Sequence, residues 1–216
     1  MDADNLDFLS DKKKKVDFQK DIQINIDKKT DDEKIVIIED LFKKIMIELG
    51  LDLNDDSLSG TPRRVAKMYV KEIFSGLNVQ NKPKVSLFDN HFEYQKILLQ
   101  KNIELTSTCE HHFLPFTGKA HIGYIANDKI IGLSKLNRIV NYFSKKPQVQ
   151  EKLTKEIFVE LRNILKTDSV IVYIHANHSC VSCRGIKDNS SSTVSMEYGG
   201  DFQQKSMRKE FFDMVL

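Results

Sequence analysis

The side chains best suited to chemistry lie in two short stretches, residues 109–112 and residues 178–185. Together they hold all three cysteines of the chain and three of its six histidines. Cys109 and His112 are three residues apart, a spacing that lets both side chains reach one ion, and Cys180 follows 68 residues beyond His112. Thiolate and imidazole are the ligands that Zn²⁺ prefers. The spacing therefore predicts a metal site rather than unrelated core and surface residues.

Two kinds of zinc site are compatible with this pattern. In a closed structural site, Cys183 would join the three residues above as a fourth ligand, whereas a catalytic site would leave the fourth position open for water. Spacing alone slightly favours the closed site. His111 and His178 favour the catalytic one, because a structural zinc does not use them and a catalytic zinc needs acid and base groups that titrate near neutral pH.

Composition excludes several broad classes of function. With 216 residues, 40% of them hydrophobic, the chain is long enough for one ordinary domain with a real core. A formal net charge of +2 gives no general reason to bind nucleic acid or a membrane surface, and no apolar run approaches the ~18 to 20 residues of a membrane helix. An odd number of cysteines without an apolar signal segment indicates a reducing compartment. We therefore expect a cytoplasmic protein without nucleic-acid or membrane partners.

The N-terminal region divides into a leader and a first helix. Residues 1–29 are rich in Asp, Lys and Asn, a composition typical of a disordered, solvated segment. Residues 30–33 have the form of a capping box and open an amphipathic helix. Its apolar residues recur at every fourth position from Ile37 to Leu49, and Gly50 ends it.

A second helix is expected from residue 61 to about residue 76, with Pro62 at its first helical position. The two helices make up a helical N-terminal part, residues 30–77. Arg63 and Arg64 lie in the first turn of the second helix, where the helix dipole disfavours cations. Either an anion nearby or a solvated surface pair would account for them.

The rest of the chain, residues 95–216, is expected to form a sheet with inserted helices. Strands are predicted at residues 97–99, 103–108, 117–125, 169–176 and 192–198. Helices are predicted at residues 133–143, 149–165 and 208–215. Cys109 and His178 then lie at or just past strand ends, while His121 lies in mid-strand as a structural residue. The result is an α+β domain with an N-terminal helical pair.

From about Leu53 to the C-terminus, several separate motifs in the correct order resemble GTP cyclohydrolase I. The motifs are TPRRVAKMY (61–69), EIFSGL (72–77), CEHHF (109–113), GLSKL (132–136), QVQEKLT (148–154) and Cys180 with Arg184-Gly185. The resemblance implies a GTP cyclohydrolase I-like domain over residues 30–216, with residues 95–216 in the tunnelling fold (T-fold). In that fold an antiparallel sheet and two helices per subunit assemble into a barrel. It also implies a homo-oligomer, usually a decamer, with active sites between subunits.

The same resemblance implies a zinc-dependent hydrolase. The family converts GTP and water to 7,8-dihydroneopterin triphosphate and formate, the first step of tetrahydrofolate and pterin biosynthesis. Zinc suits this chemistry, since zinc-bound water with a pKa lowered towards ~7 is a better nucleophile for C8 of guanine than neutral water. On the family pattern Cys109, His112 and Cys180 are the Zn²⁺ ligands, with water as the fourth. His111 and His178 match the catalytic histidines.

The resemblance also assigns the contacts with GTP. Glu151 matches the residue that holds guanine, because a carboxylate offers two acceptors to the N1 and exocyclic amine donors, although a carboxylate in the first turn of a helix has a plainer explanation. Gln150 is expected beside it on the ribose or base. The phosphate contacts are Lys135, Arg138 and Arg184, with Ser134 at the sugar end and Arg64 from a neighbouring subunit.

Two other functions are compatible with part of the pattern. One is a non-catalytic Cys₃His zinc scaffold or binding module, in which Cys183 closes the metal site; relatives commonly carry a non-ligating residue at this position. His111, His178, Glu151 and Arg184 argue against it, because a scaffold does not require them. The other is a related tunnelling-fold enzyme for a different purine or pterin. It is disfavoured because the cations expected to bind the triphosphate (Lys135, Arg138 and Arg184) and the CEHH motif occur together.

Overall fold

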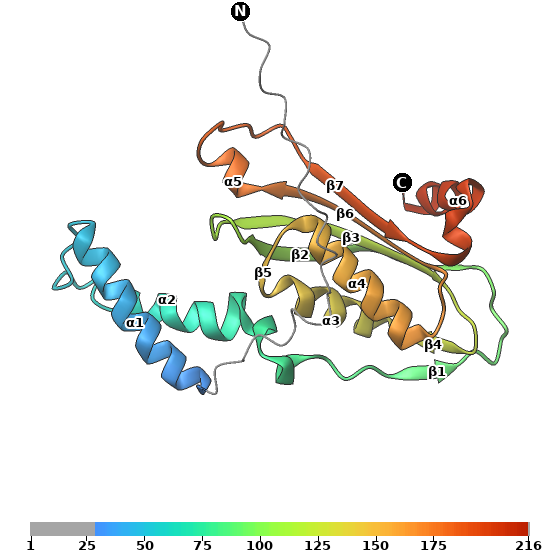
Figure 1. Ribbon diagram of the computed structural model, residues 1–216, viewed down its shortest axis with the longest axis horizontal. Coiled ribbons are helices and arrows are strands. Elements are labelled where there is room, and N and C mark those ends of the chain that lie inside the picture. The colour runs from blue at the N-terminus through green and yellow to red at the C-terminus, as the bar shows by residue number, and fades with distance from the viewer. Residues whose placement is uncertain (1–28, 216) are drawn as a thin grey trace, which may run out of the picture.

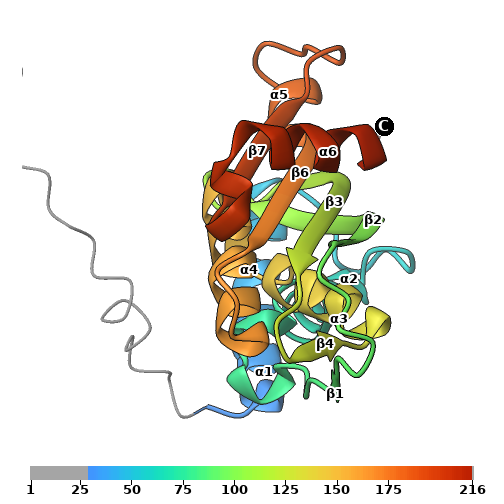
Figure 2. The ribbon, with the colours of Figure 1, turned by 90° about the vertical axis from the view of Figure 1, so that its right-hand side faces the viewer.

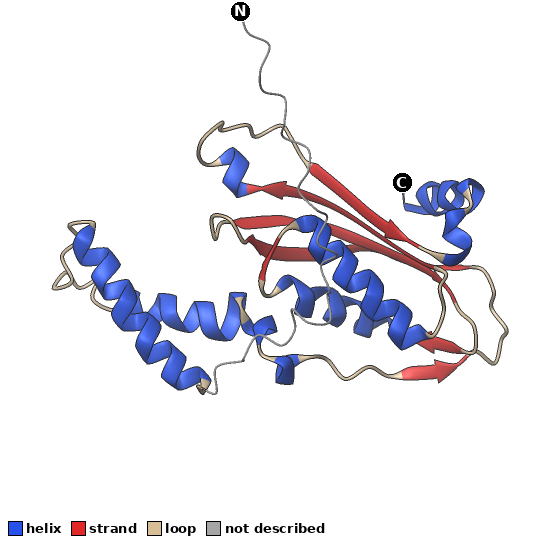
Figure 3. Ribbon diagram, viewed as in Figure 1, coloured by secondary structure: helices blue, strands red, loops and turns tan. Residues whose placement is uncertain are grey.

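The structure is a computed structural model that describes residues 29–215 (Figure 1). The leader expected at residues 1–29 lies outside the described residues, apart from residue 29. A helical N-terminal part leads into a sheet packed against helices, so the predicted α+β class is confirmed (Figure 3). Among the described residues, no helix is both long enough and apolar enough to cross a membrane.

The first helix begins at the predicted capping box. The helical N-terminal part contains α1 (Asp31–Glu48), α2 (Thr61–Met68), a π-helix (Tyr69–Ile73) and two 3₁₀ turns (Ser75–Leu77 and Val79–Asn81). The Thr30 hydroxyl accepts a hydrogen bond from the Glu33 amide at 3.3 Å, and the Glu33 carboxylate accepts one from the Thr30 amide at 2.7 Å. Both bonds satisfy amides that have no partner inside the helix.

The apolar row that predicted α1 faces outward in the single chain. Leu41 is 53% exposed and Leu49 is 71% exposed, whereas Ile35 and Met46, on the row beside them, are buried. The reason is that α2 packs against only one side of α1. Because α1 is apolar on two adjacent rows, α2 covers one of these rows and the other stays exposed.

The start of α2 and the end of the helical part are both tied to their surroundings. Arg63 of α2 forms an ion pair with Glu39 of α1 at 2.9 Å. Glu39 is therefore the nearby anion that accounts for a cation in the first turn of a helix. The Gly76 amide donates to the Lys145 carbonyl at 2.7 Å, and a Cβ at Gly76 would lie 2.3 Å from the Tyr142 carbonyl oxygen. Only glycine lets the two backbones approach this closely.

One five-stranded sheet carries the rest of the chain, in the order β5-β2-β3-β6-β7. Its strands are β2 (Ile97–Cys109), β3 (Pro115–Ile125), β5 (Pro147–Gln148), β6 (Val170–His178) and β7 (Thr193–Tyr198). All neighbours are antiparallel except β2 and β5. The strands predicted at 97–99 and 103–108 are a single strand, in which the register shifts between Gln100 and Ile103.

The helices of this part lie on both faces of the sheet. They are α3 (Leu133–Ser144), α4 (Gln150–Leu165), α5 (Ser179–Ser182) and α6 (Lys205–Val215), with a 3₁₀ turn at Gly200–Gln203. α3 and α4 cover one face with the main core, and α6 packs against the other (Figure 2). A second, two-stranded sheet of β1 (Leu87–Asp89) and β4 (Lys129–Ile131) was not predicted.

The buried face of α3 agrees with its predicted spacing. Leu136, Ile139, Val140 and Phe143 all belong to the main core. Burying a side chain of this kind contributes about 1.5–3 kcal/mol relative to leaving it exposed. Packing of these four side chains therefore helps to hold α3 against the sheet.

His121 lies in mid-strand in β3, as predicted. It is 7% exposed, its ring lies against Tyr173 with centroids 5.6 Å apart, and its Nδ1 has no hydrogen-bond partner among the described residues. Burial is the main cause that lowers the pKa of His121 below its usual value, and the charges of Lys119, Lys101 and His175 lower it further.

The lowered pKa of His121 makes the stability of the fold depend on pH. Below about pH 6.5 the unfolded chain takes up a proton on this residue, while the folded chain does so only at a lower pH. The free energy of unfolding should therefore fall as the pH drops below about 6.5. Urea titrations between about pH 5 and 8 would measure it. His121→Gln should flatten this slope, whereas His91→Gln, at an exposed position, should not; equal slopes in all three proteins would contradict the assignment.

Candidate metal centre and active site

The two stretches of Cys and His residues meet at one end of the sheet (Figure 1). β2 ends at Cys109, β6 ends at His178, and α5 follows directly with Cys180. The register of β3 and β6 pairs Phe116 with His178, which brings α5 beside the turn between β2 and β3. Antiparallel pairing thus joins segments that are about 70 residues apart in the sequence.

Three ligand atoms converge there. Those of Cys109, His112 and Cys180 all lie within 4.8 Å of one another. An ion about 2.0–2.3 Å from each atom would bridge them with a small contraction, and two thiols with one imidazole are a donor set that suits zinc. These side chains can therefore hold one metal ion. Cys183 is exposed just after α5 and is not part of the group.

The turn that carries His112 is held on both sides. The Cys109 amide donates to the Leu114 carbonyl at 2.8 Å, and the Phe113 amide donates to the Cys109 carbonyl at 2.9 Å. The Phe113 ring lies 5.3 Å from that of Phe74, in the helical N-terminal part. The metal-binding turn is thus packed against that part.

The groups around Cys180 oppose its ionisation when no metal is bound. Burial, and then the neighbouring Cys109 thiol, raise the pKa of Cys180 above its usual value. The Sγ of Cys109 is also 3.8 Å from Nδ1 of His111. A bound metal ion reverses this effect, because it stabilises the thiolate.

His178 is held from two sides next to the metal group. Its ring stacks on Phe116 with centroids 4.5 Å apart, and its Nε2 lies 2.9 Å from Oε1 of Gln150. Burial lowers the pKa of His178, and the negative charge of Glu151 partly opposes this. The imidazole is therefore neutral at pH 7, where it can accept a proton.

Gln150 determines which nitrogen of that ring carries the proton. The Gln150 side chain is 2% exposed, and its Nε2 lies 3.0–3.2 Å from Ile174 O, Thr193 O and Ser195 Oγ. Because its amide hydrogens are directed to these acceptors, its Oε1 faces His178 as an acceptor. His178 then carries its hydrogen on Nε2 and leaves Nδ1 free. Gln150 lies behind His178, and this contact was not predicted.

A short backbone ladder joins the metal group to the start of α4. β5 pairs with β2 in parallel, with Cys109 opposite Gln148, and the Glu110 amide donates to the Gln148 carbonyl at 3.0 Å. Gln150 and Glu151 follow at once in the first turn of α4. Glu151 is exposed and has no hydrogen bond or ion pair with the residues that the structure describes, and it does not cap α4.

The residues predicted to bind phosphate are divided between the two ends of the sheet. Arg184 is exposed close to α5, on the side of the metal group. Ser134, Lys135 and Arg138 lie at the start of α3, after β4 at the opposite end (Figure 1).

The distance between the two ends follows from β2. Asn137 Oδ1 lies 3.5 Å from Gln100 Nε2, and Cys109 is nine residues further along the strand. At about 3.3 Å per residue, this corresponds to roughly 30 Å. One chain does not bring the start of α3 to the metal group.

Arg64 lies in α2, in the helical N-terminal part. Its guanidinium donates to the Ser57 carbonyl and to the Thr61 hydroxyl, both at 2.8 Å.

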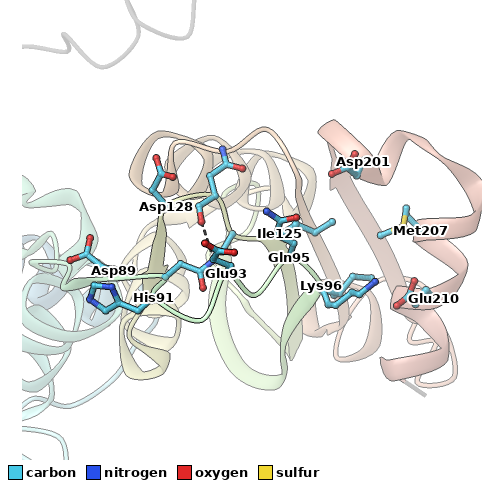
Figure 4. Close-up of a pocket in the computed structure, with 14 residues that line it drawn as sticks. Asp89, His91, Glu93, Gln95, Lys96, Ile125, Asp128, Asp201, Met207 and Glu210 are labelled. Carbon is cyan, nitrogen blue, oxygen red and sulfur yellow. Dashed lines mark hydrogen bonds between the residues drawn. The ribbon is translucent and has the colours of Figure 1, made fainter.

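A surface cavity of about 1020 Å³ lies at the end of the sheet away from the metal group (Figure 4). Its lining includes the carboxylates of Asp89, Glu93, Asp128, Asp201 and Glu210. None of the candidate residues lines it. A lining with this charge repels polyphosphate, so the cavity is a poor site for a nucleotide triphosphate.

Comparison with known proteins agrees with the motifs. The family model described as GTP cyclohydrolase I matches residues 38–216. The chain belongs to the GTP cyclohydrolase I family. GTP cyclohydrolase 1 from Flavobacterium johnsoniae is 53% identical over 186 residues, which are 86% of this chain and 83% of the relative. The protein of that name from Wigglesworthia glossinidia brevipalpis is 54% identical over 170 residues, 78% of this chain and 79% of the relative.

Membership of the GTP cyclohydrolase I family confirms the resemblance found in the sequence. Sequence reasoning did not find the supports of the site, such as Phe116 under His178 and Phe74 against Phe113. The contact between Phe116 and His178 could have been predicted from the alternation of side chains along β3 and β6. Once the register of two strands is known, this alternation determines which residues face each other.

Proposed function

We propose that the chain is a zinc-dependent GTP cyclohydrolase I, which hydrolyses GTP to 7,8-dihydroneopterin triphosphate and formate and so starts tetrahydrofolate and pterin biosynthesis. One observation carries the proposal: in a chain of this family, the ligand atoms of Cys109, His112 and Cys180 converge within 4.8 Å. Two further imidazoles, His111 and His178, lie beside them.

Cys109, His112 and Cys180 would hold the zinc ion. When bound, zinc would supply a water molecule with a pKa of about 7, a competent nucleophile for C8 of guanine. His178 is neutral at pH 7 and accepts a proton at Nδ1, because Gln150 occupies Nε2. His111, next to Cys109, is the second group placed to move protons on and off the ring nitrogens and the sugar.

Glu151 would hold the guanine base. Its carboxylate is exposed, has no hydrogen bond or ion pair with the described residues, and lies one residue from Gln150, which contacts His178. Two carboxylate oxygens in one plane complement the N1 and exocyclic amine donors of guanine. A guanine bound there extends from the start of α4 towards the metal group, which is the direction in which C8 must point.

Glu151→Ala is expected to lower kcat/KM for GTP while zinc stays bound. The loss should be about 10²–10⁴-fold, since two charge-assisted hydrogen bonds of roughly 1.5–3 kcal/mol each are removed. Steady-state kinetics and metal content would be measured together, with Glu93→Ala as a matched exposed carboxylate. Unchanged turnover of the Glu151 variant would contradict the recognition role.

We further propose that the active site is completed by a second copy of the chain. Arg184 would reach the triphosphate beside the metal group. Ser134, Lys135 and Arg138 start roughly 30 Å away along β2, so they would serve the site of a neighbouring subunit. Arg64 would also be supplied by a neighbouring subunit, because α2, which carries it, belongs to the helical N-terminal part.

Two features favour a closed homo-oligomer in the tunnelling fold. Along its outer edge β2 is paired only at Thr108 and Cys109, and β7 has no strand on its outer side among the described residues, so the sheet has open edges on both sides. Pairing of β7 with β2 of the next subunit would close the sheets into a barrel and remove both edges. The uncovered apolar row of α1 is a second surface for contact between subunits. We propose a decamer.

Mixing two inactive variants tests the shared site. Cys180→Ala removes a metal ligand and Arg138→Ala removes a clamp residue from a different subunit, so each protein alone should be nearly inactive. Subunit exchange should restore about a quarter of the activity, because random mixing leaves that fraction of sites with both residues intact. Light scattering should give about 250 kDa, ten times the chain mass of 25.0 kDa. No recovery in exchanged oligomers would contradict a shared site.

The direct test of the function is formate release from GTP by the zinc-loaded protein, with the metal-free protein beside it. Stoichiometric formate and a dihydropterin absorption band are expected only with zinc. Zinc binding without formate release would favour the closed structural site and a scaffold role.

A further inference from the structure

Cys183 is the one thiol that the proposed function does not use. It follows α5, which carries Cys180, and its amide donates to the Ser179 carbonyl at 2.9 Å. Cys183 itself has helical backbone angles, with φ −94° and ψ −9°. The helical turn therefore continues through Cys183 and places the two cysteines three positions apart on it.

This spacing matches the geometry of a disulfide. Residues three apart in a helix lie on the same face, with Cα atoms about 5 Å apart. Disulfides need a Cα separation of about 4.4–6.8 Å. Cys180 and Cys183 can therefore be joined after rotation of their side chains, without moving α5.

The two thiols differ in what they contact. Cys180 is half-buried and belongs to the metal group, whereas Cys183 is exposed and outside it. Cys109 is buried at 6% exposure and lies on another element. An oxidant arriving from solution meets Cys183 first, and the nearest thiol on the same turn is that of Cys180.

We propose that Cys180 and Cys183 form an oxidative modification site, at which a hydroperoxide creates a disulfide that withdraws one ligand from the metal. The inference rests on the proposed metal site for its consequence, but not for the formation of the bond. Once Cys180 is in a disulfide, only Cys109 and His112 remain, and two ligands hold zinc poorly.

The chemistry balances with the hydroperoxide as the two-electron oxidant. The Cys183 sulfur attacks the O–O bond, taking a hydroxyl group to become a sulfenic acid, and releases water or an alcohol. The Cys180 sulfur then attacks the Cys183 sulfur, the S–OH bond breaks, and the leaving hydroxide takes the proton of the Cys180 thiol and departs as water. Two thiols lose two hydrogens, and the peroxide is reduced. A dithiol reductant reverses the bond.

The test exposes zinc-loaded protein to hydrogen peroxide and follows zinc release with a chromogenic chelator. Mass spectrometry of the intact chain and of its peptides detects the disulfide directly. The unmodified chain should lose two hydrogens, yield a peptide linked between Cys180 and Cys183, and release zinc, all reversed by dithiothreitol. Cys183→Ser should release zinc about tenfold more slowly at the same dose.

A matched control keeps the number of thiols constant. Cys183→Ser combined with Ser182→Cys moves the thiol by one residue, about 100° around the helix, and should behave like Cys183→Ser alone. The proposal is overturned if the linked peptide joins Cys109 to Cys180 in every variant, or if zinc release is equally fast in all of them.

The same experiment on metal-free protein separates the two hypotheses. A chain that binds no zinc but still forms the Cys180–Cys183 bond would refute the proposed metal site and keep the modification site. A chain that binds zinc and releases formate but never forms this bond would refute the modification site and keep the proposed metal site.

Discussion

Cys109→Ala is expected to reduce formate release from GTP by about 10³-fold or more, because the water that attacks C8 would lose the metal ion that lowers its pKa towards ~7. Cys109 lies at the end of β2, where its amide donates to the Leu114 carbonyl, and its sulfur lies within 4.8 Å of the ligand atoms of His112 and Cys180. Zinc content, measured by elemental analysis, should fall together with the activity.

Cys183→Ser is the matched control for that experiment. It removes a thiol from the same end of the sheet, outside the metal group, and should leave zinc content and formate release unchanged under reducing conditions. Because Cys109 is buried in the main core, circular dichroism of both variants would separate loss of metal from loss of fold. A folded Cys109→Ala protein with full zinc and full activity would refute the ligand assignment.

His178→Ala should retain zinc and lose about 10²–10⁴-fold in kcat, the usual contribution of a positioned general acid or base. The reason is that His178 is neutral at pH 7 and has Nδ1 free to accept a proton. In the unmodified enzyme the contribution of His178 to the rate should be lost only when the pH drops below about 6.5, since burial lowers the pKa of His178. Equal loss of zinc and activity in this variant would make His178 a metal ligand instead.

Gln150→Leu tests how His178 is positioned. Leucine fills a similar volume but accepts no hydrogen bond, so the ring loses the partner that holds its hydrogen on Nε2. The rate should fall about 10–100-fold with zinc retained, as for other residues that orient a catalytic group. Gln150→Glu keeps an acceptor beside His178 but sets its other oxygen against the Ile174 and Thr193 carbonyls, so it should recover only a small part of the activity. If Gln150→Leu changed only KM, a direct contact with the substrate would be the better interpretation.

The helices and the metal group were predictable from the sequence, for physical reasons. The 3.6-residue period of α3 selected Leu136, Ile139, Val140 and Phe143, because a helix beside a sheet buries one stripe. The residues of the metal group were predictable because few residue types bind zinc, and the chain has few cysteines.

Other features depend on tertiary contacts that a local pattern does not contain. Lys101 and Asn102 interrupt the alternation of β2, so the strand was predicted as two pieces, yet pairing with β3 continues across the shifted register. The covered row of α1 depends on where α2 packs. Gln150 contacts Ile174 and Ser195, which are 24 and 45 residues away, and neither its sequence position nor its residue type indicates that it holds His178.

The parallel pairing of β5 with β2 fixes a distance within the proposed site. The ladder that joins Cys109 to Gln148 is made of backbone hydrogen bonds, and Glu151 is only three residues further along the chain. The ladder and the three covalently linked residues therefore fix the separation between the backbones of Cys109 and Glu151, so only the two side chains can adjust the distance between the metal group and the carboxylate. On the proposed function, a base would be accepted when its C8 edge and its amide edge together span the distance between the metal group and the Glu151 carboxylate. The length of the fused purine, more than the outline of any cavity, would then be what the enzyme recognises.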